Sequence, residues 1–392
     1  MNEIAELLER GVSDLVVRKD LEEKIKSGKK LRVKFGIDPT GSDLHIGHAV
    51  ILRKLRDFQN MGHHIILILG TFTAQIGDPT GKTEVRKVLS REEVQSNIQN
   101  YKQEISKILD VNKVEFRENH EWLADMSFTE LIEVSQSFTV SQMIERDMFQ
   151  DRMKKGLPIS LHEFFYPLMQ AYDSVVLRAD LEIGATEQTF NLLAGRTLQK
   201  AFGEKPQDVM TMPVLEGTDG KEKMSKSLGN FIAISDSPRE MFGKTMSIPD
   251  ELIIKYFELT TDYSQKDIEQ VKKSLAAGEN PRNAKLDLAR NLVNIYHGAE
   301  AASVAQREFL EMFQKKGLPE DMPQFNFEGS KGILDILFES KVLSSKSEAR
   351  RMISQNAVSI DGEKITDPNL ALSCNQQVIK VGKRKFLKLG KA

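Results

Sequence analysis

The sequence predicts an α/β fold built on a parallel sheet, followed by a helical region and a small α+β unit. Two apolar segments of strand length, 31–37 (LRVKFGI) and 64–70 (HIILILG), flank an amphipathic stretch from His45 to Gly62. Apolar strands separated by a helix are typical of a βαβ unit, whose parallel sheet is buried on both faces. Strand patterns fade after Asn230, and a short helix and a hairpin are predicted near the end of the chain.

The composition is that of an ordinary globular protein. The chain has 392 residues, of which 40% are hydrophobic and 29% charged, enough for two or three domains. The single cysteine, Cys374, cannot form an internal disulfide, which is typical of a reducing compartment. The longest apolar run, Ile65 to Leu69, is far shorter than a membrane span, and the acidic start MNEIAELLER differs from a targeting peptide. We therefore expect a cytoplasmic protein with no membrane segment.

The formal net charge of −2 hides an uneven distribution. From Ser330 to Ala392 the chain holds twelve Lys or Arg and six Asp or Glu, so this segment carries +6 and the rest −8. An evenly spread charge of this sign disfavours a nucleic-acid partner. A basic segment beside an acidic body instead indicates a contact with nucleic acid.

A helical domain and a linker are predicted after the strand-rich part. Ser237, Pro238 and Glu240 form a capping box with proline at the first helical position, and the pattern stays helical to about Phe313. The segment 316–332 holds several prolines and glycines without periodicity, which is typical of a linker.

Beyond the linker, a basic helix and a hairpin are predicted. Ser345 and Glu348 form a capping box at the start of a helix that carries Lys346, Arg350 and Arg351. The next residues, AVSI, an Asp-Gly turn and EKI, predict a hairpin. A basic helix beside a hairpin suits an RNA clamp, and from these residues alone a solvated charged helix is an equal alternative.

Two histidines lie where the first predicted strand passes into its helix, in the motif HIGH. A helix N-terminus in a parallel sheet favours phosphate, and the spacing of three places His45 and His48 on one side of the first turn. Both could donate hydrogen bonds to phosphate oxygens, while Gly47 lets a nucleobase or ribose approach the backbone. From these four residues alone, it is equally possible that the two histidines only begin a helix and have no functional role.

A short basic loop, KMSKS at 223–227, closes the α/β region between Gly220 and Gly229. Lys223 and Lys226 can reach the same polyphosphate as mobile point charges. A solvated charge run explains two lysines, but it does not explain their place at the far end of the region that the histidines open.

Two further segments bear on ligand binding. Tyr166, Gln170 and Asp173 share one face of a predicted helix that is otherwise apolar, so they must find partners or face a polar cavity. A surface-facing stripe is the alternative. GDPTGKT at 77–83 resembles a P-loop, but Ile76 stands where that motif needs glycine, so a phosphate-cradling loop is not specified.

Together these segments resemble one known family. HIGH followed by KMSKS is the double signature of the class I aminoacyl-tRNA synthetases, and the likeness continues through DPT, GDPTGK and YPLMQAYD. Nearly the whole chain is similar to bacterial tyrosyl-tRNA synthetases with a KMSKS loop, and SKSEARRMISQNAVSIDGEKITD is similar to S4 RNA-binding domains. The resemblance implies ATP-dependent activation of L-tyrosine to tyrosyl-adenylate, then transfer to the 3'-terminal adenosine of tRNA(Tyr).

The resemblance also implies a domain plan. It comprises a Rossmann-like catalytic domain over 1–229, a helical anticodon-arm domain over 230–315, the linker 316–332 and an S4 domain over 333–392. A homodimer is implied, with Mg²⁺ arriving on ATP. No structural metal is expected, because the histidines are scattered and the cysteine is single.

Roles follow for the residues that match the family's motifs. Those matched to phosphate chemistry are Thr40, His45, His48, Lys82, Arg86, Lys223 and Lys226. Those matched to ATP or adenylate binding are Gly36, Asp38, Gly47, His48, Gly184, Glu187 and Lys226. Those matched to tyrosine binding are Asp78, Tyr166, Gln170, Asp173 and Gln188, and those expected to contact tRNA are Lys346, Arg350 and Arg351.

Three positions depart from the family's usual pattern. Relatives commonly carry aspartate where Glu187 stands, tyrosine where Lys34 stands and aspartate where Thr71 stands. Glu187 keeps the carboxylate with a longer reach, and Lys34 is left without a role. These changes bear on affinity rather than on the type of reaction, because the phosphate-handling groups are all present.

Three rival functions are weighed against this one. Intact HIGH and KMSKS argue against an RNA-binding protein that has lost catalysis. The S4-like segment argues against a tyrosine ligase of a small-molecule pathway. The Tyr, Gln and Asp stripe argues against a tryptophan-specific relative.

Overall fold

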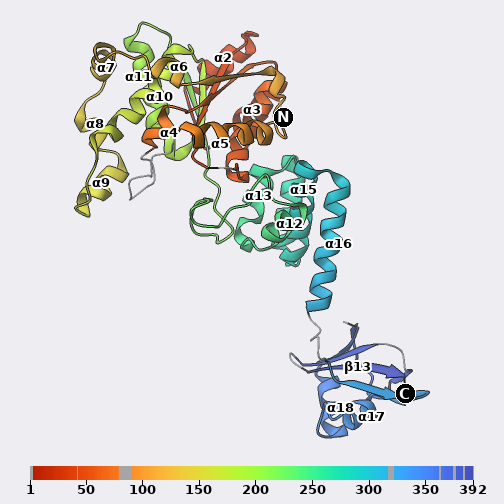
Figure 1. Ribbon diagram of the computed structural model, residues 1–392. Coiled ribbons are helices and arrows are strands. Elements are labelled where there is room, and N and C mark those ends of the chain that lie inside the picture. Colours follow the sequence, from red (N-terminus) through yellow and green to blue (C-terminus); the bar gives the residue numbers. More distant parts are fainter. Residues whose placement is uncertain are drawn as a thin grey trace. The chain divides into compact units, whose positions relative to one another are not determined.

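The computed structural model describes residues 3–41, 43–78, 91–316, 322–361, 363–373, 377–382 and 385–391 (Figure 1). It contains two compact units, Met1–Gln306 and Arg307–Ala392, and the boundary falls within the helix α16, Ala299–Lys316. The finer division of the first unit at residue 229, and the start of the S4 domain at 333, stay predictions.

A six-stranded sheet forms the centre of the first unit, in the order β1-β6-β5-β2-β3-β4. Neighbours from β6 to β4 pair in parallel, and β1 pairs antiparallel with β6 at the edge. The strands are β1 Asp14–Val16, β2 Arg32–Ile37, β3 His64–Leu69, β4 Val114–Glu118, β5 Leu181–Ala185 and β6 Asp208–Met212. The predicted βαβ unit is confirmed, because β2 and β3 pair in parallel on either side of the helix α3, Ile46–Asn60.

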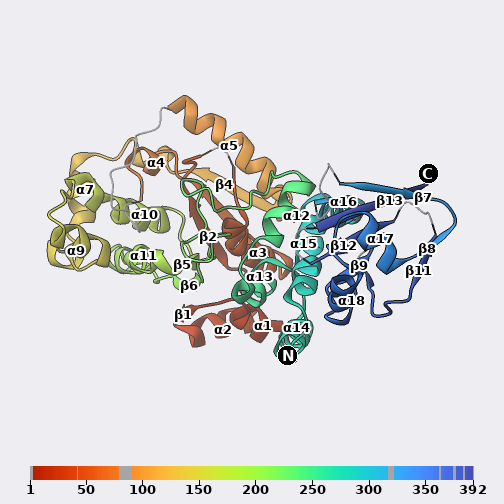
Figure 2. The ribbon, with the colours of Figure 1, turned by 90° about the horizontal axis from the view of Figure 1, so that it is seen from below.

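Helices cover both faces of this sheet, α10 and α11 on one and α3 on the other (Figure 2). Strand β3 is apolar and buried from Ile65 to Leu69 because both of its faces are covered. The α-helices of this part are α1 Glu3–Glu9, α2 Arg18–Lys26, α3, α4 Thr73–Ile76, α5 Arg91–Ile105, α6 His120–Leu123, α7 Phe128–Ser135, α8 Val140–Ile144, α9 Asp147–Lys154, α10 Phe165–Val176 and α11 Thr189–Ala201. Short 3-10 helices are η1 Val111–Lys113, η2 Leu161–Phe164 and η3 Thr186–Gln188.

The helical region predicted after residue 230 is confirmed. Ser237 caps α12 by accepting a hydrogen bond from the amide of Glu240, and Pro238 is its first residue. These helices are α12 Pro238–Met246, η4 Asp250–Leu252, α13 Ile253–Thr260, α14 Gln265–Ala276, α15 Pro281–His297 and α16. Ion pairs from Arg53 and Arg56 to Asp262 join α3 to the segment after α13.

The second unit has its own core of apolar side chains from two helices and several strands. The predicted basic helix and the hairpin of β9 with β10 are confirmed, and Ser345 caps the helix. Cys374 and Gly362 lie outside the described residues. The elements are β7 Gln324–Phe327, β8 Ser330–Gly332, α17 Ile333–Glu339, α18 Lys346–Ser354, β9 Val358–Ile360, β10 Glu363–Lys364, β11 Ala371–Ser373, β12 Val378–Val381 and β13 Lys385–Lys391.

The segment predicted as a linker, 316–332, contains two of these strands. β7 pairs in parallel with β13, and β8 pairs antiparallel with β11. Both partners lie some 40 residues or more along the chain, so local prolines and glycines gave no sign of the pairing. Among the helices that the structure describes, none is long and apolar enough to cross a membrane.

Two glycines in helices allow a matched stability test. A Cβ at Gly195 of α11 would lie 2.5 Å from Nε2 of Gln207 and 3.0 Å from Oγ of Ser174, whereas one at Gly243 of α12 meets nothing within 4 Å. Alanine gains about 1 kcal/mol over glycine in a helix, but overpacking costs about 1–3 kcal/mol. We expect Gly195→Ala to lower, and Gly243→Ala to raise, the free energy of unfolding.

Urea denaturation followed by the fluorescence of Trp122, the sole tryptophan, measures both variants in the unit that holds them. An equal gain in stability from the two alanines would contradict the close packing of α11.

Candidate functional site

A pocket of about 500 Å³ lies at the carboxyl ends of β2, β5 and β6. Strand β2 lies at the centre of the sheet, between β3 on one side and β5 on the other, so the strand order reverses its direction at β2. Where the strand order of a parallel sheet reverses, a crevice opens at the carboxyl ends of the strands, and ligands bind there. Twelve predicted residues line this pocket: Gly36, Asp38, Thr40, His45, Gly47, His48, Asp78, Tyr166, Glu187, Gln188, Lys223 and Lys226.

The other predicted residues do not line this pocket. Gly184 precedes the lining residue Ala185, Gln170 and Asp173 lie on α10 after the lining residue Tyr166, and Lys82 and Arg86 lie outside the described residues. Lys346, Arg350 and Arg351 are exposed on α18 in the second unit, where Lys346 forms an ion pair with Asp335.

The HIGH histidines begin α3, with His45 as its N-cap residue. The amide of His45 donates to Nδ1 of His48 at 3.2 Å, and the two rings lie 3.8 Å apart between centroids. Burial, together with the charge of Lys226, lowers the pKa of His48 to about 3 and also lowers that of His45. Both imidazoles are therefore neutral at pH 7, and Nδ1 of His48 accepts, so its proton is on Nε2.

The backbone around HIGH excludes larger side chains. A Cβ at Gly47 would lie 2.9 Å from Nδ1 of His45, so glycine lets that ring fold over the first turn. The amide of Ile46 donates to the carbonyl of Ile232, which fixes the helix start against the chain that follows the KMSKS loop.

The KMSKS loop is anchored in its middle and carries a lysine on each side. Met224 is buried and its amide donates to the carbonyl of Leu215. Asn230 holds the loop from behind, because its Oδ1 accepts from the amide of Ser225 at 2.8 Å and its Nδ2 donates to the carbonyl of Lys223 at 3.2 Å. Sequence reasoning missed this role of Asn230, which depends on how the loop folds back.

The two lysines face different surroundings. Lys223 donates to both carboxylate oxygens of Glu187 at 3.0 Å, and both residues line the pocket. Nζ of Lys226 lies 5.7 Å from the centroid of the Tyr101 ring, and burial lowers its pKa. A Cβ at Gly41 would lie 2.6 Å from that Nζ, so Lys226 lies against the loop after β2.

Asp38 links the loop after β2 to α10. Its carboxylate accepts from the hydroxyl of Tyr166 at 2.9 Å and from Oγ1 of Thr73 at 2.8 Å. A Cβ at Gly70 would lie 2.0 Å from Asp38 Oδ1, so the residue that follows β3 must be glycine. Sequence reasoning missed Arg146, whose guanidinium lies 4.8 Å from the Phe190 ring centroid and interacts electrostatically with Asp78 and Tyr166.

Asp173 lies at the buried end of the site and is only 3% exposed. Its carboxylate accepts from Nε1 of Trp122 at 2.8 Å and, more weakly, from Nδ2 of Asn119 at 3.5 Å. Burial raises the pKa of Asp173 to about 7, opposed by the positive charge of Lys34 and by these hydrogen bonds. Asn119 and Trp122 have no motif in the sequence, because they reach Asp173 from a separate element after β4.

Gln170 is half-buried and does not line the pocket. Its Nε2 donates to Glu182 at 3.0 Å, and its Oε1 accepts from Nδ2 of Asn191 at 3.1 Å. Gln188 instead lines the pocket, with its Oε1 accepting from the amide of Ala185 at 3.2 Å.

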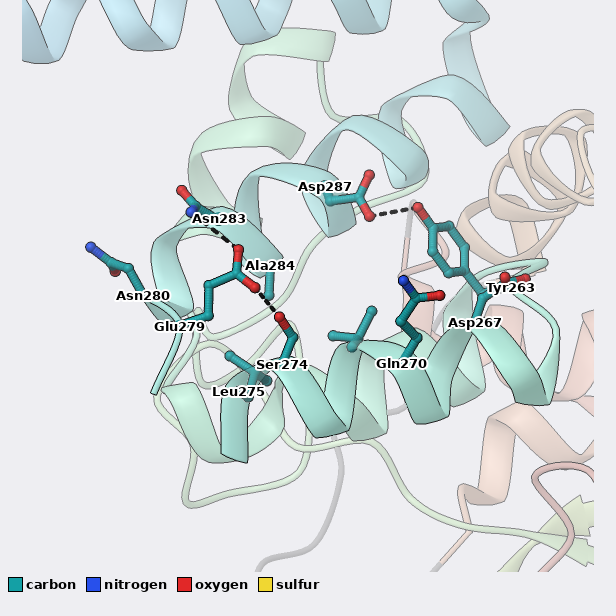
Figure 3. Close-up of a pocket in the computed structure, with 11 residues that line it drawn as sticks. Tyr263, Asp267, Gln270, Ser274, Leu275, Glu279, Asn280, Asn283, Ala284 and Asp287 are labelled. Carbon is teal, nitrogen blue, oxygen red and sulfur yellow. Dashed lines mark hydrogen bonds between the residues drawn. The ribbon is translucent and has the colours of Figure 1, made fainter. Parts of the chain in front are cut away.

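A second pocket, of about 360 Å³, lies between α14 and α15 (Figure 3). Its acids are Asp267, Glu279 and Asp287, and the last accepts from the hydroxyl of Tyr263 at 2.6 Å. Acidic walls repel phosphate, and no predicted site residue lines this pocket. Within the described ranges, no group of three or more His, Cys, Asp or Glu could hold a metal ion.

Comparison with known proteins covers the chain almost from end to end. Residues 26–314 match the family described as tRNA synthetases class I (W and Y), and residues 314–389 match the tyrosine–tRNA ligase SYY-like C-terminal domain. The chain is 50% identical to a tyrosine–tRNA ligase of Carboxydothermus hydrogenoformans, covering 98% of this chain and 97% of that protein. It is also 50% identical to that of Thermotoga maritima, with 99% and 97% covered.

Solved structures with low identity share the fold. A C-terminally truncated mitochondrial tyrosyl-tRNA synthetase of Aspergillus nidulans has a TM-score of 0.67 at 22% identity, covering 79% of this chain and 94% of that one. The Archaeoglobus fulgidus tyrosyl-tRNA synthetase with L-tyrosine has a TM-score of 0.62 at 22% identity, covering 78% and 99%.

The identity of about one residue in two along the full length carries the assignment, and the pocket holds both family signatures. The chain belongs to the tyrosine–tRNA ligases, a family of class I aminoacyl-tRNA synthetases, and its reaction is the ATP-dependent ligation of tyrosine to tRNA(Tyr).

Proposed function

We propose that both steps of the ligation occur in the pocket at the carboxyl ends of β2, β5 and β6. In the first step, the tyrosine carboxylate attacks the α-phosphorus of ATP and pyrophosphate leaves. In the second, a terminal ribose hydroxyl of tRNA(Tyr) attacks the tyrosyl carbonyl and AMP leaves. The observation that carries this proposal is that His45, His48, Lys223 and Lys226 line one pocket together with Tyr166.

We assign charge stabilisation during the first step to the HIGH and KMSKS groups. The neutral imidazoles of His45 and His48 donate N–H groups to phosphate oxygens, without a buried charge in the free enzyme. Thr40 and the two lysines act on the β- and γ-phosphates, joined by Lys82 and Arg86. No protein nucleophile is needed, so positioning and electrostatics supply the catalysis.

The adenosine lies over the glycines of the site. Gly36 and Gly47 line the pocket and let the base and ribose approach the backbone, Gly184 supports the site from the end of β5, and Glu187 accepts from a ribose hydroxyl. Because Glu187 is paired with Lys223 in the free enzyme, ATP binding must separate them so that each takes its own part of the nucleotide. Mg²⁺ enters as part of the ATP substrate.

Tyrosine lies with its phenol at Asp173 and its ammonium near Asp38. Asp78 and Tyr166 hold the ammonium, Gln170 supports them from behind, and Gln188 faces the carboxylate. Asp173 accepts the phenol hydroxyl, and a phenylalanine in its place leaves a buried carboxylate without that donor.

We also infer a homodimer in the cytoplasm, where tRNA is charged. Large apolar side chains are exposed on three successive helices of the α/β part, α7, α8 and α9, and burying them against a protein partner is favourable. They are Phe128 at 78%, Ile132 at 45%, Val140 at 71% and Met153 at 52% exposure. In a twofold-symmetric dimer, the same surface of each copy faces the other, so these side chains would be buried in both copies.

The direct test is pyrophosphate exchange into ATP, driven in turn by tyrosine, phenylalanine and tryptophan, with and without tRNA. Of the three amino acids, we expect only tyrosine to support exchange, and we expect it to do so without tRNA. Exchange with tryptophan, or none without tRNA, contradicts the proposal.

Lys226→Ala is expected to slow adenylate formation about 100-fold, because it removes a donor aimed at charge that develops in the transition state. The dissociation constant of tyrosine should change by less than about twofold, since the lysine does not contact tyrosine. Stopped-flow measurement of adenylate formation checks this. Lys221→Ala, an exposed lysine on the same loop outside the pocket, is the control and should leave both quantities unchanged.

Asp173→Asn is expected to reduce discrimination between tyrosine and phenylalanine at least about tenfold, because a hydrogen bond to a charged group contributes about 1.5–3 kcal/mol. The ratio of kcat/KM for the two amino acids in pyrophosphate exchange measures this. Asp125→Asn, at an exposed site, is the matched control. An unchanged ratio in Asp173→Asn removes Asp173 from phenol recognition.

The double variant Arg350→Ala and Arg351→Ala tests the tRNA surface on α18. We expect the KM for tRNA to rise, and the dependence of log KM on log salt to fall by about two, because two phosphate contacts are lost. Tyrosine-driven exchange without tRNA should not change. Lys272→Ala on α14 is the control, and an equal effect there contradicts a role specific to α18.

A further inference from the structure

A lysine and a glutamate form an ion pair inside the protein, beneath α10. Lys34 of β2 and Glu182 of β5 are opposite each other in the parallel register, and their Nζ and Oε1 lie 2.9 Å apart. The side chains are 0% and 1% exposed. Burying two charges is costly unless their remaining bonds are satisfied, so such a pair calls for an explanation beyond stability.

Every proton of the Lys34 ammonium has an acceptor. Nζ donates to the carbonyl of Gln170 at 2.9 Å and to Oγ of Ser174 at 2.7 Å, besides Glu182. The two α10 acceptors are one turn apart, so the ammonium lies across the turn that includes Asp173. This geometry ties α10 to the middle of the sheet at one point.

The Glu182 carboxylate, like the Lys34 ammonium, has several hydrogen-bond partners. Its carboxylate accepts from Nε2 of Gln170 at 3.0 Å, from Oγ of Ser174 at 3.2 Å and from Nε2 of Gln207 at 2.5 Å. The contact with Gln207 depends on Gly195, because a Cβ there would lie 2.5 Å from Gln207 Nε2. The pair is therefore built into the packing of α10, α11 and the sheet.

We propose that the buried Lys34–Glu182 pair is a positioning device for tyrosine recognition: Lys34, held across the α10 turn that carries Asp173, favours the charged carboxylate, and Glu182 opposes it. The proposal rests on the proposed role of Asp173 as acceptor of the phenol hydroxyl. Lys34 and Glu182 act through Asp173 and need not touch the substrate. Sequence reasoning left Lys34 without a role, because its partner is 148 positions away in the chain.

The charged and polar groups that face Asp173 come from several elements. Lys34 on β2 favours its charged form and Glu182 on β5 opposes it, while Trp122 on α6 and Asn119 donate hydrogen bonds. With burial, these groups hold the pKa of Asp173 at about 7. The two charges of the pair therefore act on Asp173 in opposite directions, and removing either one alters its ionisation.

The two partners of the pair make opposite predictions. Removing the cation with Lys34→Met disfavours the ionised carboxylate, so the Asp173 midpoint rises by about one pH unit. Removing the anion with Glu182→Gln favours ionisation, so the midpoint falls. A purely structural role predicts shifts in the same direction or none, because both variants break the same ion pair.

Trp122 gives a readout without catalysis, because its indole N–H donates to Asp173 and it is the sole tryptophan. We expect its fluorescence in the free protein to titrate near pH 7, with a higher midpoint in Lys34→Met and a lower one in Glu182→Gln. Lys34→Arg, which keeps the charge, should retain the wild-type midpoint. Shifts of the same sign in the two charge-removing variants, or no shift in either, overturn the proposal.

Tyrosine affinity should fall in the variant whose Asp173 midpoint rises. At pH 7 we expect the tyrosine dissociation constant to rise about tenfold in Lys34→Met, while the KM for ATP changes less than about twofold. Should Lys34→Met not fold, the double variant Lys34→Met with Glu182→Gln is compared with Glu182→Gln alone. A higher midpoint in the double variant supports the proposal, and equal midpoints overturn it.

Asp173→Asn separates this inference from the proposed function. If the fluorescence transition persists in Asp173→Asn, or if that variant discriminates phenylalanine normally, the assignment of Asp173 itself fails. If the fluorescence transition disappears in Asp173→Asn but its midpoint is the same in wild type, Lys34→Met and Glu182→Gln, only the role of Lys34 and Glu182 fails.

Discussion

The parallel pairing of β2 with β5 is the constraint on which the rest of the site depends. It joins two strands far apart in the chain at the centre of the sheet, in the register that places Lys34 beside Glu182. At the carboxyl end, the same pairing opens the crevice between the loop after β2 and the turn after β5. One contact therefore positions both the pocket and the buried charges beneath it.

A chain of hydrogen bonds connects the two ends of this site. It runs from Asp173 through Asn119 to Thr73, then to Asp38 and the Tyr166 hydroxyl. The end assigned to the tyrosine phenol is thus linked to the loop that leads to HIGH. Since each buried polar atom in the chain needs its neighbour, recognition and catalysis share one rigid set of side chains.

Much of the fold was predictable, because its signals are local. Apolar runs specify β2 and β3, and Ser237 and Ser345 cap helices through residues three positions away. The motifs HIGH and KMSKS supply eight of the 24 residues that line the pocket. The strands β7 and β8 were missed because their partners, β13 and β11, are distant in the chain, and nothing local marks such a pairing.

By itself, the sequence determined the chemistry available to this protein: two histidines at a helix start, two lysines in a loop bounded by glycines, and a polar stripe on one helix. Only the tertiary structure decided the state of these groups. Burial makes the histidines neutral, Asn230 shapes the lysine loop, and Trp122 and Lys34 converge on Asp173 from separate elements. The reason is physical, because residue type sets which charges and donors exist, whereas desolvation and neighbouring charges depend on what the fold places around them.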